Sequence, residues 1–233
     1  MTAGKPAPIS RRERPAKPAL TRTGIVATAM DVLRAEGLDR LTMRRLAQEL
    51  DTGAASLYVY VRNTAELHAF MLDELLAEVD LGPVSATGDW RDRLVRILWS
   101  YTEVLIDRPG LAQSALVTRP SGPGYLSLVD GLLAVMSDAV PADRAAWAVD
   151  LMLHVATSTA VEQGTRRHAL DTRDEEDRVV AAILDASPDS YPRIASLGME
   201  LMSGSGRQRL TWAFHVLMTG VLQTPRPAPD ASG

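Results

Sequence analysis

Hydrophobic residues recur every three to four positions in one segment of this chain after another, and no stretch of useful length alternates between apolar and polar residues. The first spacing is typical of helices with one buried face, whereas the second would indicate strands. The pattern therefore predicts an all-α protein. The predicted helices are 23–36, 43–50, 54–61, 64–80, 88–107, 111–116, 122–138, 142–165, 174–186, 189–202 and 206–222.

The second and third predicted helices are short and are joined by a tight turn. Thr42 has a side chain that can cap the first of them. We expect Gly53 to supply the left-handed backbone that closes it. In the next helix, Leu57 and Val61 share one face and leave the other side to solvent. Such a pair is either a helical hairpin in a core or a helix-turn-helix whose second helix fits the major groove of DNA.

The distribution of charge favours DNA. Residues 1–63 carry eleven Lys and Arg against six Asp and Glu, whereas the rest of the chain carries fourteen against twenty-three. Phosphate binding needs a local basic surface and not a basic protein. An acidic chain with a basic N-terminal part is typical of a DNA-binding domain on a larger acidic body.

We expect four parts along the chain. Residues 1–20 combine five Lys and Arg with four prolines, which predicts a disordered basic arm that either contacts DNA or is only a solubilising leader. Residues 21–64 would form the helix-turn-helix domain and 65–223 a larger helical domain. The prolines of 224–233 predict a disordered tail.

Other chemistry is scarce. The chain has no cysteine, which excludes disulfides and thiolate metal sites. Its four histidines lack metal-ligand spacing, and no Gly-rich phosphate loop follows a strand. No apolar run approaches the ~20 residues that span a bilayer. We therefore expect no metal, no cofactor, no enzymatic activity and no membrane insertion, and a cytoplasmic location.

Several positions of this chain also resemble a known family. In the N-terminal part they are Ile25, Ala29, Leu33, Gly37, Leu41, Thr42, Leu46, Ala47, Leu57, Tyr58, Asn63, Leu67, Phe70, Met71 and Leu75. Further along they are Trp90, Asp107 to Gly110, Thr118 to Pro120, and Glu162. Together they are similar to the tetracycline-repressor (TetR) family of bacterial transcription regulators. The resemblance covers roughly 22–165 and, more loosely, 207–222. It implies a three-helix DNA-binding head on a body that binds an effector and dimerises.

The resemblance also implies which residues of the head contact DNA. They are Thr42, Arg44, Ser56, Tyr58, Tyr60 and Thr64. An arginine can bind a phosphate or a guanine edge, and the hydroxyl groups can reach phosphates. The chain departs from the tetracycline repressor at Ala54 and Val59, and Thr64 replaces the usual Lys. These departures imply a different operator sequence.

The predicted helices 142–165 and 206–222 are apolar on more than one side, so each must be covered on more than one side. Both could be ordinary core of a monomer. The resemblance instead implies a four-helix bundle made with the same pair of a second subunit. A two-fold homodimer would read a palindromic operator with one head on each half-site.

The body is where the resemblance places an effector. The candidate contacts are Ile97, Tyr101, Leu116, Thr118, Arg119, Pro120, Trp147, Leu151, His154 and Glu162. Each of them could equally be ordinary core. Several polar drug contacts of the tetracycline repressor fall here on other residue types, and the His that ligates magnesium is missing. A magnesium-tetracycline chelate is therefore not the expected effector, and a small, largely apolar molecule is.

These features together predict a homodimeric repressor that is released from DNA when an effector favours a second arrangement of the heads. The alternative is an all-α protein that binds or sequesters a small molecule and has no specific affinity for DNA.

Overall fold

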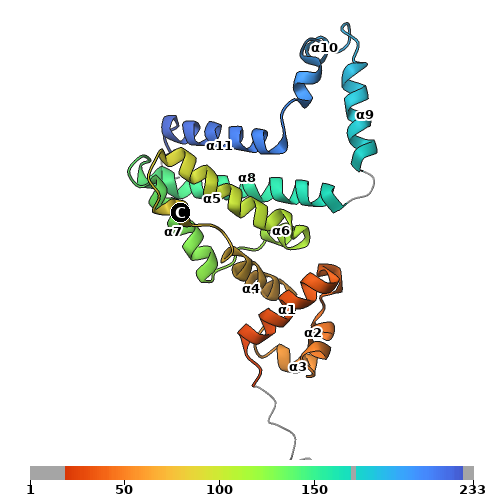
Figure 1. The fold of residues 1–233 in the computed structure, drawn as a ribbon, viewed down its shortest axis with the longest axis vertical. Coiled ribbons are helices and arrows are strands. Elements are labelled where there is room, and N and C mark those ends of the chain that lie inside the picture. Colours follow the sequence, from red (N-terminus) through yellow and green to blue (C-terminus); the bar gives the residue numbers. More distant parts are fainter. Residues whose placement is uncertain (1–18, 169–171, 228–233) are drawn as a thin grey trace, which may run out of the picture.

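The computed structural model describes residues 19–168 and 172–227, and within these limits the chain is helical with no strand (Figure 1). The prediction of an all-α fold is confirmed. The helices are α1 (Arg22–Glu36), α2 (Met43–Glu49), α3 (Ala54–Leu57), α4 (Thr64–Leu76), α5 (Trp90–Ile106), α6 (Pro109–Ala115), α7 (Pro123–Met136), α8 (Ala142–His168), α9 (Thr172–Leu184), α10 (Pro192–Leu197) and α11 (Gly206–Gln223). Short 3₁₀ helices are η2 (Leu38–Arg40), η3 (Gly82–Val84) and η4 (Gly198–Met202). Most of the predicted arm (1–18) and the end of the predicted tail (228–233) lie outside the described residues.

Helices α1, α2 and α3 form a small head below the body in Figure 1. The Thr21 side chain caps α1 by accepting a hydrogen bond from the Gly24 amide at 3.1 Å. Apolar residues from α1, α2, α3 and the turn after α3 pack together in the core of the head. Among them, Ile25, Leu46, Leu57 and Val61 are fully buried. Because these four residues fix the rotation of each short helix, the opposite sides of α2 and α3 face solvent.

Helix α4 connects the head to the body. It begins directly after Asn63, whose side chain accepts from the Glu66 amide at 2.9 Å. It packs against α1 of the head and against α5, α6 and α7 of the body. His68 Nδ1 lies 3.1 Å from Ser114 Oγ on α6, and burial lowers the pKa of that imidazole. The position of α4 is thus tied to both parts of the molecule.

Helices α5 and α8 form the centre of the body. Small residues of α8, among them Ala148, Ala156 and Ala160, are buried and let the two helices approach closely. At Gly164 a Cβ atom would lie 2.8 Å from the backbone oxygen of Ile106, so this contact requires glycine. Helix α11 lies along α8, and its Phe214 and Met218 complete the core (Figure 1).

The segment of α9, α10 and η4 projects away from the end of α8 in Figure 1. Its elements pack mainly on one another. Within the described ranges, no helix is both long enough and apolar enough to span a bilayer.

Three local expectations are wrong. Regular helix in α3 ends at Leu57, and turns carry the chain on to Tyr60. The left-handed residue between α2 and α3 is Asp51, at φ 47°, whereas Gly53 is extended, at φ −85°, and precedes α3. Aspartate tolerates this conformation because its short polar side chain can hydrogen-bond locally. The predicted helix 189–202 starts only at Pro192 and breaks at Gly198, at φ 49°.

Replacing Leu46 by Ala is expected to lower the free energy of unfolding by about 2–5 kcal/mol, because it leaves a cavity in the small core of the head. Denaturant unfolding followed by circular dichroism measures the change. Gln48→Ala, on the exposed side of the same helix, is the matched control and should change stability by less than about 0.5 kcal/mol.

Candidate nucleic-acid interface and ligand cavity

The exposed side of α2 and α3 carries the residues predicted to contact DNA. Thr42, Arg44, Ser56 and Thr64 are exposed, and the Tyr58 side chain keeps 51% of its surface accessible. Tyr60 is half-buried against the core of the head. The structure therefore gathers five of the six predicted residues on solvent-facing positions, with the sixth partly withdrawn.

Val59 lies between the two tyrosines and is 79% exposed. Leu57 before this turn and Val61 after it are fully buried, so Tyr58 and Val59 are the apolar and aromatic side chains of the turn that face solvent. An exposed apolar side chain can contact thymine methyl groups. Hydroxyl groups and a guanidinium can contact phosphates.

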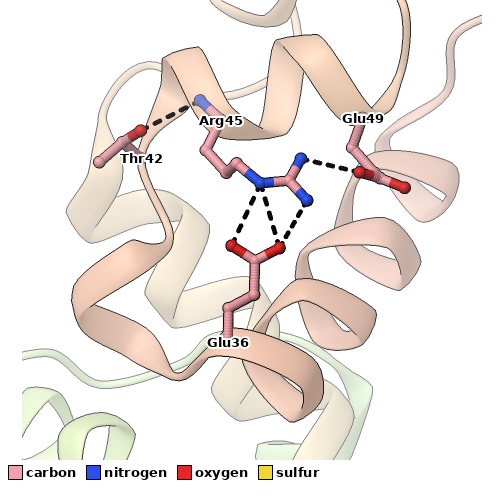
Figure 2. Close-up of polar contacts among 4 residues, drawn as sticks. All are labelled: Glu36, Thr42, Arg45 and Glu49. Atoms are coloured by element: carbon pink, nitrogen blue, oxygen red, sulfur yellow. Dashed lines mark hydrogen bonds and ion pairs between the residues drawn. The ribbon is translucent and has the colours of Figure 1, made fainter.

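The adjacent arginines of α2 have different environments, and Figure 2 shows that of Arg45. Arg45 holds Glu36 at the end of α1 with a forked contact, in which Nε lies 3.1 Å and Nη2 2.5 Å from Oε1. Its Nη1 also donates to Glu49 at 2.7 Å. Arg44 is exposed, and within the described part of the chain its side chain makes no ion pair. Arg45 therefore joins α1 to α2, and Arg44 is available to a ligand.

Both groups of this ion pair titrate away from their usual ranges. The hydrogen bond from Arg45 lowers the pKa of the Glu36 carboxyl group, and the hydrogen bond to Glu36 raises the pKa of Arg45. The four-residue spacing of Arg45 and Glu49 signals one of the two contacts, but the partner across the turn, Glu36, depends on the fold.

Thr42 has a structural task as well. Its Oγ1 accepts from the Arg45 amide at 3.0 Å and so caps α2, as predicted. Its hydroxyl hydrogen is left for another acceptor, because the cap uses only the oxygen. Thr64 follows the capping residue Asn63 and stands in the exposed first turn of α4.

In the body, six of the ten predicted effector contacts line one small cavity of about 70 Å³. They are Tyr101, Leu116, Thr118, Arg119, Pro120 and His154. The other walls come from α4, α5, α6, α7 and α8, through Leu72, Leu76, Leu105, Ala115, Tyr125, Asp150, Leu153 and Thr157. The cavity thus lies where α4 meets the body.

Inside the cavity the polar groups form a chain. Thr157 Oγ1 donates to the Leu153 carbonyl oxygen at 2.7 Å, and Tyr101 Oη lies 2.6 Å from the same Oγ1. Because the single threonine hydrogen is used, the tyrosine is the donor of this pair. Burial raises the pKa of Tyr101 to about 12. The neutral phenol therefore keeps an oxygen that can accept a hydrogen bond from a ligand.

At the outer wall of the cavity, Arg119 forms an ion pair with Asp150 of α8. Both side chains are more than half exposed, so the pair is surrounded by water and connects the loop after α6 to α8.

The structure does not bring the other four predicted contacts into this cavity. Ile97 is fully buried in α5. Trp147 and Leu151 line a groove of about 730 Å³ between α8 and α11, together with His154. Glu162 pairs with Arg166 at 2.8 Å and borders a different hollow. The reason is the helical repeat of α8, since Leu153 and Thr157 face the cavity while Trp147 and Leu151 lie on another side.

That other side of α8 continues across α11 as an exposed apolar face. Trp147 and Leu151 of α8 are 53% and 42% exposed, and Trp212 and Val216 of α11 are 69% and 47% exposed. On the opposite side of α11, Leu210, Phe214 and Met218 are buried within the chain itself. Trp212 was not among the residues selected from the sequence, because its exposure becomes visible only in the structure.

The start of the predicted tail is placed against this face. The Arg226 guanidinium lies 4.2 Å from the centre of the Trp147 ring and donates to the Asp143 carbonyl oxygen at 3.2 Å. Pro225 and Pro227 border the same groove.

Comparison with known families gives one match for the head and another for the body. Residues 25–69 match the family of bacterial regulatory proteins, tetR family, and residues 82–224 match the tetracyclin repressor-like C-terminal domain. The chain belongs to the TetR family. The two matches fall on the head with the start of α4 and on the body, and the predicted resemblance is confirmed. Membership in a family of regulatory proteins also agrees with the expectation that the chain is not an enzyme.

Several proteins of known structure share this TetR architecture. SCO7704 from Streptomyces coelicolor, a candidate transcription regulator, is 51% identical over 91% of this chain and 100% of its own, with a TM-score of 0.77. ActR from the same organism, in complex with actinorhodin, is 30% identical over 92% of this chain and 100% of its own, with a TM-score of 0.79.

Among curated proteins, the HTH-type transcriptional repressor DrrR1 of Streptomyces coeruleorubidus is 35% identical over 54% of this chain and 46% of its own length. The chain spans about half the length of this repressor and of a similar HTH-type regulator from Saccharopolyspora erythraea.

Replacing Glu36 by Gln is expected to lower the melting temperature slightly at neutral pH and progressively less below pH 4.5. The folded-state pKa of Glu36 lies below its ordinary value of 4.5, so its stabilising contribution is complete above that pH and is lost as the pH falls through the folded-state pKa. Thermal unfolding at pH 7 and pH 3.5 measures both differences. Equal differences at the two pH values would show that the carboxylate charge does not matter here.

Proposed function

We propose that this chain is a transcriptional repressor that binds a palindromic operator as a homodimer and is released by a small, largely apolar effector other than magnesium-tetracycline. The observation that carries the proposal is the exposure of Arg44 on α2, Ser56 on α3 and Tyr58 directly after α3, while Leu57 of the same short helix is fully buried. A regulator of this kind would act in the cytoplasm.

The homodimer is supported by the apolar face of α8 and α11. Two exposed tryptophans on neighbouring helices are unusual for a surface that meets only water. If the same face of a second copy covers it, the four helices bury both sides and relate the two heads by a two-fold axis. Two heads related in this way read two inverted half-sites, which makes the operator palindromic.

Release by an effector is supported by the cavity beneath α4. At about 70 Å³ it has space for a few waters at ~30 Å³ each and not for a drug-sized molecule. A ligand would therefore enter only if the surrounding helices move apart. Leu72 and Leu76 of α4 are part of the wall, so binding would shift the helix that holds the head.

The nature of the effector is supported by the wall and by one relative. Most of the wall is apolar, with Tyr101 offering an acceptor inside and Arg119 and Asp150 at the outer side. ActR, whose fold is similar, has been crystallised with actinorhodin. We propose a largely apolar molecule with at least one hydrogen-bond donor as the effector of this chain.

Arg44→Ala is expected to weaken specific operator binding at least tenfold, because a guanidinium contact with a base or phosphate is worth about 1–3 kcal/mol. A mobility-shift titration against the upstream intergenic DNA of the gene, with unrelated DNA as competitor, measures it. The matched control is Arg45→Ala, the other arginine of α2. This variant should lower the melting temperature of the protein, because Arg45 forms ion pairs with Glu36 and Glu49.

The parent protein should also lose affinity steeply as salt rises, since binding releases counterions from phosphates. Absence of specific binding at any salt concentration, combined with ligand binding in the body, would favour a protein that only binds or sequesters a small molecule. Unchanged operator affinity in Arg44→Ala would show that this face does not read DNA.

Replacing both Trp212 and Val216 by Glu is expected to convert the dimer into a monomer, because two carboxylates in each half of the interface would lose their hydration without a partner. Light scattering coupled to size exclusion measures the mass. Leu126→Glu, at a side chain of α7 that is 60% exposed, is the control and should stay dimeric. A dimer that survives both substitutions would place the interface elsewhere.

A further inference from the structure

We infer that Asp73 is a positioning residue that fixes the direction of α4, and so the place of the DNA-binding head, by capping the first turn of α7 from another helix. We call this contact the Asp73 clasp. It goes beyond the proposed function, and only its consequence for operator binding rests on that function.

The clasp satisfies amide groups that α7 cannot satisfy by itself. The capping position of α7 is Gly122, which has no side chain to accept a hydrogen bond, and the next residue, Pro123, has no N–H group. The first donors of the helix are therefore the amides of Gly124 and Tyr125. They donate to Asp73 Oδ2 at 3.3 Å and to Oδ1 at 2.9 Å.

Charge strengthens the contact. The N-terminus of a helix has a partial positive charge, and a carboxylate that accepts its amides is bound more tightly than a neutral acceptor. Asp73 is half-buried, so water competes with it less than at an open surface. A neutral side chain of the same shape would keep the packing and lose most of this attraction.

Two glycines make the approach of the two helices possible. A Cβ atom at Gly122 would lie 2.1 Å from Asp73 Oδ2, and one at Gly124 would lie 2.2 Å from the Asp73 backbone oxygen. The second clash is with the backbone of α4 and could be relieved only by moving the helix. The Gly-Pro-Gly sequence at 122–124 is therefore explained by the place that α4 occupies.

The clasp also connects the cavity to the head. Tyr125, whose amide Asp73 holds, borders the cavity, and so does Leu72, the neighbour of Asp73 on α4. In the other direction α4 runs back to Thr64, about 13 Å away along the helix axis. A displacement of α7 at the cavity must then either move α4 with it or break the clasp.

Spin-label distances between head and body test the inference without DNA. The chain has no cysteine, so Gln48→Cys on α2 and Ser127→Cys on α7, both at exposed positions, would carry the only two labels. Labelled subunits diluted with unlabelled ones report the distance within one chain. We expect a narrow distribution in the parent background and a shifted or broader one with Asp73→Asn.

Two further variants separate positioning from folding. Glu74→Gln, an exposed carboxylate beside Asp73 on α4, is the matched control and should leave the distribution unchanged. Gly124→Ala disturbs the clasp from the side of α7 and should shift the distribution as Asp73→Asn does. Each variant is first shown by circular dichroism to be as helical as the parent. A distribution in Asp73→Asn that is identical to the parent's would overturn the inference.

Operator spacing gives the functional readout. A head that is less firmly placed should discriminate less between the operator and the same operator with one base pair inserted at its centre. With Asp73→Asn we expect a roughly tenfold loss of this discrimination, which is equivalent to about 1.4 kcal/mol. If the parent binds no operator while the spin-label distances change as expected, the proposed function fails and the role of Asp73 stands.

Discussion

One helix of this protein must be buried in two cores at once. Leu67, Met71 and Leu75 of α4 are all shielded from water, and the helix contacts α1 on one side and α5, α6 and α7 on the other. Burial of these side chains removes most freedom for the helix to rotate about its own axis, since any rotation would expose apolar surface. The head is therefore held at a defined place on the body, although it has its own core.

The same helix forms part of the wall of the cavity, so under the proposed function ligand binding and the position of the head depend on the same packing. Close-packed interiors change between discrete arrangements and do not deform continuously. A cavity of about 70 Å³ that is bordered by Leu72 and Leu76 has no room for a ligand unless the packing around α4 changes. The polar contacts of α4 with the body, at His68 and Asp73, would then carry a movement of α6 or α7 to α4 and the head.

The two arginines of α2 have different roles in the head. Arg45 is committed to two carboxylates and joins α1 to α2, which leaves Arg44 as the basic group of α2 on the exposed side. In the body, the apolar residues of α8 and α11 likewise differ in their surroundings. Phe214 and Met218 are buried in the fold of the single chain, whereas Trp212 is 69% exposed and Trp147, against which Arg226 is stacked, is 53% exposed.

The sequence by itself determined the all-α fold, the cap at Thr42, and the exposed side of the two short helices of the head. These features depend on helical spacing and on hydrogen bonds between residues a few positions apart, so a linear pattern records them. The family comparison confirmed the resemblance to TetR proteins.

Only the tertiary structure decided which predicted effector contacts share a cavity, that Arg45 pairs with Glu36, and that Asp73 caps α7. It also showed that Asp51, and not Gly53, takes the left-handed conformation. Periodicity states that a side of α8 is apolar, but not whether α5, α11 or a second chain covers it. That assignment depends on the directions in which helices distant in sequence cross, and these are set by the packing of the whole core.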